Sequence, residues 1–402
     1  MSDAGGSFDL KIRSGQWLLP VLCMGGLAAN VSGRTLEPLI TVISLEFTVG
    51  VATAALLTSA YALPFAFGQP VLGPLGDIYG KVRILKISLW ALTVFLILAA
   101  FAPSFEALAI ARFCAGIAAG GVVPACMATI GDAYPAERRQ VAISKFVTMG
   151  LLAQIFGTSA SGFVGDIFGW RYVLILTAII AFVSAVAATV ILKTPATSNR
   201  QIFSFALAAN NYRYVFQNPK SILCYSTVFL EGVALFGIMP YVAELLRERQ
   251  EGGPREAGII IAAMGIGGLL YVLLLPTLLR YFTRPQFMAV GGGLITIGHI
   301  ALAVEANWVI VAGSFGVTGL GFMLLHNSIQ TEVVELAPAS RQSAYSLHAF
   351  FFFSGQAVGP VIFGVGINII GSGPSLLICA AVLAATGIII SKLFSRAVNA
   401  QR

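Results

Sequence analysis

The chain has 402 residues, of which 57% are hydrophobic and only 10% are charged, with a formal net charge of +7. A soluble domain carries about 25% charged residues, and a disordered chain is less hydrophobic and more charged than this one. The composition therefore excludes both classes and predicts an integral membrane protein.

The apolar segments are long enough to cross a membrane as helices, which takes about 20 residues each. They run continuously, whereas the strands of a membrane β-barrel alternate over about ten residues. The polar segment 1–16 is not expected to be a signal peptide. We therefore predict an all-α membrane protein with twelve spans, at residues 17–43, 50–72, 84–103, 105–130, 141–165, 171–192, 220–245, 256–279, 287–304, 308–334, 343–370 and 375–393.

The basic residues of the loops predict the orientation of the chain. If the N-terminus is cytoplasmic, eighteen Lys and Arg residues lie on the cytoplasmic side and four on the other side. Such an excess marks the cytoplasmic face of a membrane protein, so both termini are expected there. The positive charge then reflects topology, and we expect no nucleic-acid partner.

The sequence also predicts two halves. The longest polar stretch follows the sixth span, and a shift of 202 residues places Arg139-Gln140 on Arg341-Gln342 and Gly157 on Gly359. Paired halves are one architecture of transporters, which bind substrate between them near the middle of the membrane. We predict a first bundle of six helices at 1–192, a cytoplasmic linker at 193–219 and a second bundle at 220–402.

The loop after the second span reads Gly-Pro-Leu-Gly-Asp-Ile-Tyr-Gly-Lys-Val-Arg at residues 73–83. It resembles the signature of the major facilitator superfamily (MFS), and the resemblance covers essentially the whole chain. It implies two six-helix bundles related by a pseudo-two-fold axis that rock about a central site. It also implies a gate in which Asp77 faces the start of helix eleven and Lys81 pairs with an acid at the end of helix four. The gating residues assigned in this way are Gly73, Asp77, Gly80, Lys81 and Asp132.

The chain departs from the family pattern in two places. Ile78 stands where the family usually has arginine. In span five, Thr158 and Ser161 replace a proline and a glycine of the motif that resembles that of drug and metabolite exporters. A better copy of the motif, Gly-Gln-Ala-Val-Gly-Pro at 355–360, lies in span eleven.

Charged residues inside the first six spans are candidates for a central site. Asn30, Arg34 and Glu37 are spaced to share a helix face, with Pro38 as a candidate kink. Arg34 and Glu37 either line the cavity or form an internal ion pair that orients the helix. Arg112 lies deep in span four, where an arginine is costly. In relatives it is thought to assist proton transfer, and the alternative is a structural arginine satisfied by carbonyls.

The last six spans supply a second set of candidates. Glu231 in span seven has no basic residue near it in sequence, which suggests an unpaired carboxyl that binds a proton, or one hydrogen-bonded to a neighbouring helix. His326 and Gln330 lie four residues apart and are expected to offer hydrogen bonds to substrate. His348 is a candidate titrating group or a packing residue.

Together these features predict a secondary active transporter, most simply a proton-driven exporter of a drug or metabolite in a bacterial inner membrane. The alternative is a proton-coupled symporter or uniporter that imports a small organic anion. A sensor without transport is a further alternative, against which the intact Asp77 loop argues. No phosphate loop or catalytic motif occurs, so we expect no enzyme activity, no cofactor or metal, and the proton gradient as energy source. The expected partners are a small-molecule substrate, protons and membrane lipid, with no obligate protein partner.

Overall fold

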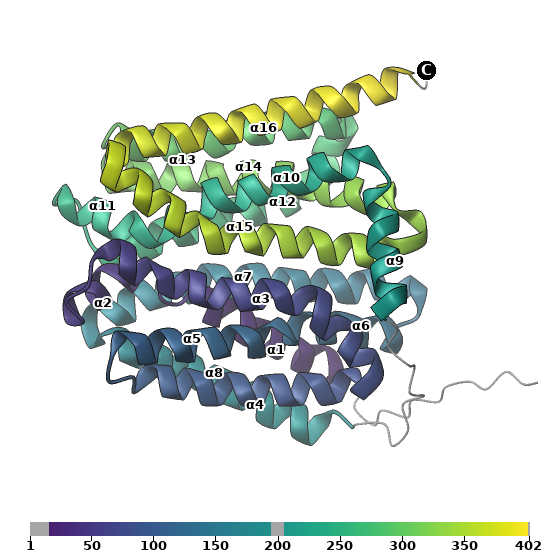
Figure 1. The fold of residues 1–402 in the computed structure, drawn as a ribbon, viewed down its shortest axis with the longest axis horizontal. Coiled ribbons are helices and arrows are strands. Elements are labelled where there is room, and N and C mark those ends of the chain that lie inside the picture. Colours follow the sequence, from purple (N-terminus) through teal and green to yellow (C-terminus); the bar gives the residue numbers. More distant parts are fainter. Residues whose placement is uncertain (1–15, 194–204, 401–402) are drawn as a thin grey trace, which may run out of the picture.

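The computed structural model describes residues 16–193 and 205–400, and the side chains of residues 72–78 are among those that it leaves out. Helices make up the ordered structure, and no strand occurs in the described ranges. Figure 1 shows them as two stacked groups of roughly parallel helices, with the first half of the chain below and the second half above. The all-α fold expected from the sequence is confirmed.

Eleven helical segments in the described ranges are long and apolar enough to cross a membrane. In the first half they are built from α3 (Val51–Tyr79), α4 (Lys81–Ala100), α5 (Phe105–Gly120) with α6 (Val122–Ala133), α7 (Ala136–Phe168) and α8 (Trp170–Ile191). In the second half they are built from α10 (Pro219–Phe236), α12 (Pro254–Tyr281), α13 (Arg284–Ala303), α14 (Trp308–Leu336), α15 (Arg341–Ile370) and α16 (Ser372–Ala400).

The predicted first span is a broken helix rather than a continuous one. It consists of α1 (Leu18–Arg34), a 3₁₀ turn η1 (Glu37–Leu39) and α2 (Ile40–Glu46). Pro38 explains the break, because its ring clashes with the carbonyl four residues earlier, and α1 ends at that residue, Arg34. The expected kink is therefore a full interruption of the helix.

The seventh span repeats this break. Helix α10 ends at Phe236, four residues before Pro240, and is followed by η2 (Met239–Tyr241) and α11 (Val242–Glu248). The two prolines are 202 residues apart, the same shift that relates the two halves in the sequence. Equivalent helices of the two halves begin 201 to 205 residues apart, so the repeat extends over the whole fold.

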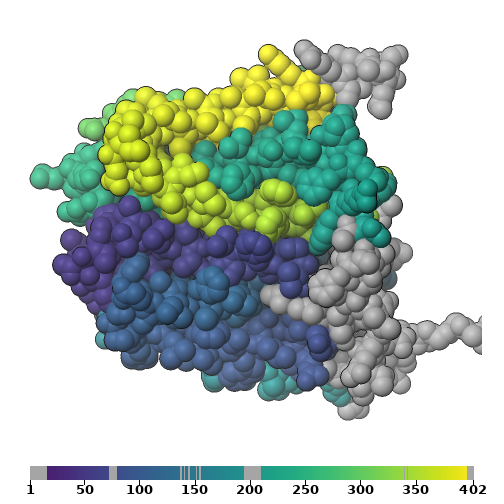
Figure 2. Space-filling model, in the orientation of Figure 1, coloured from purple at the N-terminus to yellow at the C-terminus, as the bar shows by residue number. Residues whose placement is uncertain are grey.

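The halves meet along two pairs of long helices and at one end of the molecule. Helix α3 packs on α15 and α7 packs on α12, while η1 and α2 touch η2 and α11. Figures 1 and 2 show the broken spans at one end, the α2–α11 end, and α9 (Phe205–Phe216) at the other, the α9 end. The predicted linker thus contains a helix, and its residues 194–204 lie outside the described ranges.

Candidate functional site

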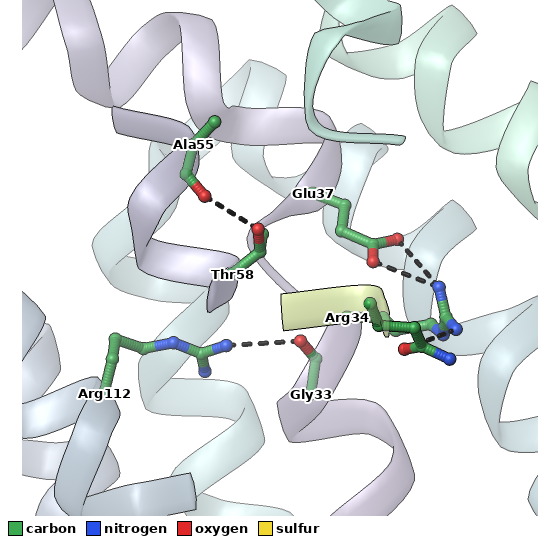
Figure 3. Close-up of polar contacts among 7 residues, drawn as sticks. Gly33, Arg34, Glu37, Ala55, Thr58 and Arg112 are labelled. Carbon is green, nitrogen blue, oxygen red and sulfur yellow. Dashed lines mark hydrogen bonds and ion pairs between the residues drawn. The ribbon is translucent and has the colours of Figure 1, made fainter. Parts of the chain in front are cut away.

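The break in the first span places an ion pair at the contact between the halves. Arg34 ends α1, and its Nη1 donates to Glu37 Oε1 at 3.1 Å. Arg34 Nη2 also donates to Gln356 Oε1 of α15 at 3.3 Å. Figure 3 shows the guanidinium of Arg34 beside the carboxylate of Glu37. A single side chain of the first half is therefore bound to both halves.

A small cavity adjoins this ion pair. Its volume is about 20 Å³, room for roughly one water molecule. Apart from Arg34, its lining is mostly apolar and comes from both halves: Thr158, Met239, Ile261, Met264, Gly265, Phe322 and Met323. The site is thus a nearly closed pocket with one cation in its wall.

Arg112 of α5 is fully buried. Its Nη1 donates to Ser32 O at 2.7 Å. Its Nη2 donates to Gly33 O at 3.2 Å, the contact drawn in Figure 3. These carbonyls belong to the last turn of α1, where a helix lacks its own donors and carries partial negative charge. The guanidinium also lies 4.4 Å from the centre of the Tyr61 ring. The carbonyl-bound arginine that the sequence left open is what the structure shows, and Arg112 does not line the pocket.

Two other expected site residues are not brought into the ion pair. Asn30 Nδ2 donates to Gly26 O of its own helix at 2.7 Å. Because α1 ends at Arg34, Asn30 and Glu37 do not share one helix face as expected. Gln330 lies one turn beyond His326 in α14, is partly buried, and makes no hydrogen bond to the described residues.

Glu231 is buried in the second half, and it is not unpaired. His326 Nδ1 of α14 is hydrogen-bonded to Glu231 Oε2 at 2.7 Å, and His348 Nε2 of α15 lies 3.2 Å from His326 Nε2. Of the two alternatives that the sequence left open, the structure shows the carboxyl hydrogen-bonded to a neighbouring helix, and the partner residue is 95 positions away in sequence. Glu231 Oε1 and His348 Nδ1 are buried without a partner among the described residues. We call Glu231, His326 and His348 the buried triad.

Three phenylalanines separate the buried triad from the ion pair. The rings of Phe236, Phe322 and Phe352 pack with centroids 5.4 to 5.9 Å apart. The Arg34 guanidinium lies 4.2 Å from the centre of the Phe236 ring, while His326 lies 4.5 Å from that of Phe352. The two polar groups therefore contact opposite sides of one aromatic layer.

The gating loop is partly described. Gly80 takes a φ of +93° between α3 and α4, a conformation that glycine adopts readily and other residues rarely. Lys81 Nζ donates to Asp132 Oδ2 at 2.7 Å, the contact that the family resemblance implied. The side chain of Asp77 and residue Gly73 belong to 72–78, outside the described side chains, so the contact of Asp77 with helix eleven stays a prediction.

The second half has a counterpart of this contact that the sequence reasoning did not identify. Arg284, at the start of α13, bonds Glu335 at 2.6 Å and Glu332 at 3.4 Å near the end of α14. A shift of 202 residues places Arg284 next to Lys81 and Glu335 next to Asp132. The repeat itself was the signal that could have revealed it.

The exporter-like motif of span eleven allows very close helix packing. A Cβ added to Gly355 would lie 2.2 Å from Phe229 O of α10, and one added to Gly232 of α10 would lie 2.4 Å from Phe352 O. Only glycines permit this approach. The same close packing aligns Gln356 with Arg34 and Phe352 with the aromatic layer.

A larger cavity of about 1,200 Å³ lies away from this closed region. It is lined by the first turns of α1, by Tyr134 and by the first half of α7, including Arg138 and Lys145. These segments lie toward the α9 end of the first half, whereas the α2–α11 end is packed shut by η1, η2, α2 and α11. The first half is thus hollowed toward the α9 end, and the two halves are in contact at the α2–α11 end.

Two related helical halves with a pocket between them are one architecture of membrane transporters. A family model described as Major Facilitator Superfamily matches residues 22–360, and the chain belongs to this family, which is one of transporters and not of enzymes.

Its relatives include the MFS-type transporter YwfA of Bacillus subtilis, which is 25% identical over 90% of this chain and 88% of its own length. The MFS-type transporter YceJ of the same organism is 26% identical over 82% of this chain and 84% of its own.

Solved structures share the fold. A crystal structure of the nucleoside transporter NupG superposes with a TM-score of 0.78 at 15% identity, covering 94% of this chain and 99% of the other. The D-xylose-proton symporter superposes with a TM-score of 0.75 at 15% identity, covering 92% and 96%. At such identities the likeness establishes the MFS fold alone.

Proposed function

We propose that the protein is a proton-driven exporter of a small molecule, working by alternating access in a bacterial cytoplasmic membrane with both termini in the cytoplasm. The distribution of basic residues supports this orientation, because it places the α9 end in the cytoplasm. The larger cavity then lies toward the cytoplasm, and the broken spans lie toward the outside.

The observation that carries the proposal is the buried triad. A carboxylate and a neutral histidine together leave one negative charge away from water, which is costly in a low-dielectric interior. One proton shared between Glu231 and His326 makes the pair neutral overall. The triad therefore favours holding a proton while it is buried and releasing it when water reaches it, which is what a coupling site requires.

The aromatic layer supports a connection between proton and substrate. Phe352 touches His326, and Gln356 lies one turn further along the same helix and bonds Arg34. A change of charge at the triad that shifts α15 therefore also alters the contact between the halves at the pocket. In the exporter, proton entry at the triad drives release of substrate from the pocket.

A second candidate is a proton symporter that imports a small organic anion. Arg34 in the wall of the pocket favours it, since an arginine there attracts an anion. The replacement of the exporter-type proline by Thr158 also favours it.

Proteoliposomes with an entrapped pH dye separate these functions. An exporter exchanges protons for substrate, so substrate added outside vesicles with an acidic lumen makes the lumen more alkaline. A symporter instead accumulates substrate only when the proton gradient points inward.

Glu231→Gln is expected to abolish gradient-driven transport and to keep substrate exchange, while Glu305→Gln, at an exposed carboxylate of the second half, serves as control. Unchanged uphill transport by Glu231→Gln would remove Glu231 as the coupling site.

A further inference from the structure

The charges around the pocket do not cancel. Two guanidinium groups, Arg34 and Arg112, lie near one carboxylate, Glu37, and the described residues offer no second acid to either arginine. The negative end of α1 offsets about half a charge at Arg112. The region around the pocket therefore holds two cations and one anion, and of these three groups Arg34 alone lines the pocket.

Two features show unused hydrogen-bonding capacity beside the pocket, at Arg34 in its wall and at Gln356, which is bonded to Arg34. Gln356 accepts from Arg34 through Oε1, while its Nε2 is buried with no partner among the described residues. Arg34 holds Glu37 mainly through one nitrogen, with the second carboxylate oxygen at 3.4 Å. A ligand carboxylate that enters beside Arg34 would gain donors from both side chains, and a bidentate arginine–carboxylate pair is among the strong contacts of this kind.

The other residues of the pocket wall determine which chemical group, attached to the carboxylate, the pocket accepts. Met239, Met264 and Met323 line the pocket with flexible thioethers, which adapt to a ligand and make favourable contacts with aromatic rings. Phe322 lines it too, and its ring packs against Phe236 and Phe352. The closed volume of about 20 Å³ has room for roughly one water molecule, so the pocket has to widen before a larger ligand enters.

We propose that this pocket binds a small aromatic monocarboxylate, with Arg34 and Gln356 on the carboxylate and the ring against Phe322. The assignment rests on the proposed transport function, because it takes the pocket to be the substrate site, but it holds for either direction of transport. A monoanion is favoured over a dianion because the excess charge of the pocket is at most one.

Ligand binding to the purified full-length protein tests the assignment without any gradient. The probes are benzoate and 4-hydroxybenzoate, the neutral benzamide, the cationic benzylamine and the non-aromatic cyclohexanecarboxylate. The two aromatic carboxylates are expected to bind, measured by calorimetry and by thermal stabilisation, and the amide and the amine to bind about 10-fold more weakly or not at all. Cyclohexanecarboxylate is expected to bind more weakly than benzoate.

Substitutions of the residues proposed to contact the ligand test each contact separately. Arg34→Gln is expected to weaken the affinity for benzoate about 10- to 100-fold. Arg34→Lys is expected to weaken it less, because lysine keeps the positive charge but cannot bind both carboxylate oxygens in the way that a guanidinium does. Phe322→Leu is expected to remove the preference for benzoate over cyclohexanecarboxylate while the preference for carboxylate over amide stays. Arg280→Gln, at an exposed arginine at the end of α12, is the matched control and should bind benzoate like the unaltered protein.

Three results would overturn the assignment: equal binding of benzamide and benzoate, unchanged benzoate affinity in a folded Arg34→Gln protein, or no binding of either aromatic carboxylate up to about 10 mM. These outcomes are independent of the coupling test. A Glu231→Gln protein that transports normally refutes proton coupling and leaves the ligand assignment intact, while absent benzoate binding leaves proton coupling intact.

Discussion

Replacing Arg112 with alanine is expected to destabilise the protein rather than to uncouple it. The change removes two charge-assisted hydrogen bonds to the end of α1, at 2.7 and 3.2 Å, and leaves Ser32 O and Gly33 O buried without donors. Such bonds contribute about 1.5–3 kcal/mol each, the longer one less, and the contact with the Tyr61 ring adds roughly 0.5–2 kcal/mol. Relief of the buried charge offsets part of this loss, so the net cost is about 3–5 kcal/mol.

A thiol-reactive dye measures the effect, because the buried thiols of Cys126 and Cys224 react only after unfolding. Arg112→Ala should melt at a clearly lower temperature than the unaltered protein, and Arg112→Lys should fall between them, since lysine keeps a charge near the helix end but cannot span both carbonyls. Arg280→Gln should melt normally. A fully stable Arg112→Ala protein that has lost only gradient-driven transport would refute the reasoning and favour a role in proton transfer.

Two further predictions follow from helix contacts. Gly232→Ala should destabilise the protein, because the added Cβ would lie 2.4 Å from Phe352 O. Gly293→Ala, whose added Cβ meets nothing within 4 Å, should be neutral or stabilising by up to about 1 kcal/mol. Equal melting temperatures of the two variants would contradict the close packing at Gly232. Reversing one charge of the Lys81–Asp132 pair should slow transport with little loss of stability, since the pair is partly exposed and worth about 0–1 kcal/mol. The double swap Lys81→Asp with Asp132→Lys should restore the rate, and a double swap as slow as the single ones would remove the pair from the gate.

Much of the fold follows from the sequence because the membrane allows few alternatives. Continuous apolar runs become helices, as the runs at 84–103 and 287–304 do, and a repeat of 202 residues relates the two halves. The breaks after Arg34 and Phe236 were harder to predict, because proline in a membrane helix produces anything from a slight bend to a full interruption. Packing between the halves decides between these outcomes, and hydropathy does not report it.

The site was predicted less completely, since its contacts join distant segments. Arg34 and Glu37 lie close in sequence, and their pairing was foreseen for that reason. Glu231 and His326 are 95 residues apart, so no local pattern could reveal that the carboxyl is bonded to the imidazole. His348 lies on α15, and its contact with His326 depends on how α14 and α15 pack against each other.

The two halves share the same order of helices but carry different charged and titratable side chains at equivalent positions. At the shift of 202 residues, Arg34 corresponds to Phe236, so the cation of the pocket faces an aromatic ring where symmetry would place a second cation. Glu231 corresponds to Ala29 and His348 to Phe146, so the first half holds none of the triad's acid–base groups at those positions.

Neither half therefore contains both the ligand-binding cation and the proton-binding groups, and an isolated half has no means of coupling the two. Among the described residues, the hydrogen bond that joins the pocket to the half that holds the triad is the one from Arg34 to Gln356. In the proposed cycle, opening the pocket separates the halves, so we expect this bond to break and re-form and the proposed coupling between proton and substrate to pass through contacts of this kind at the interface.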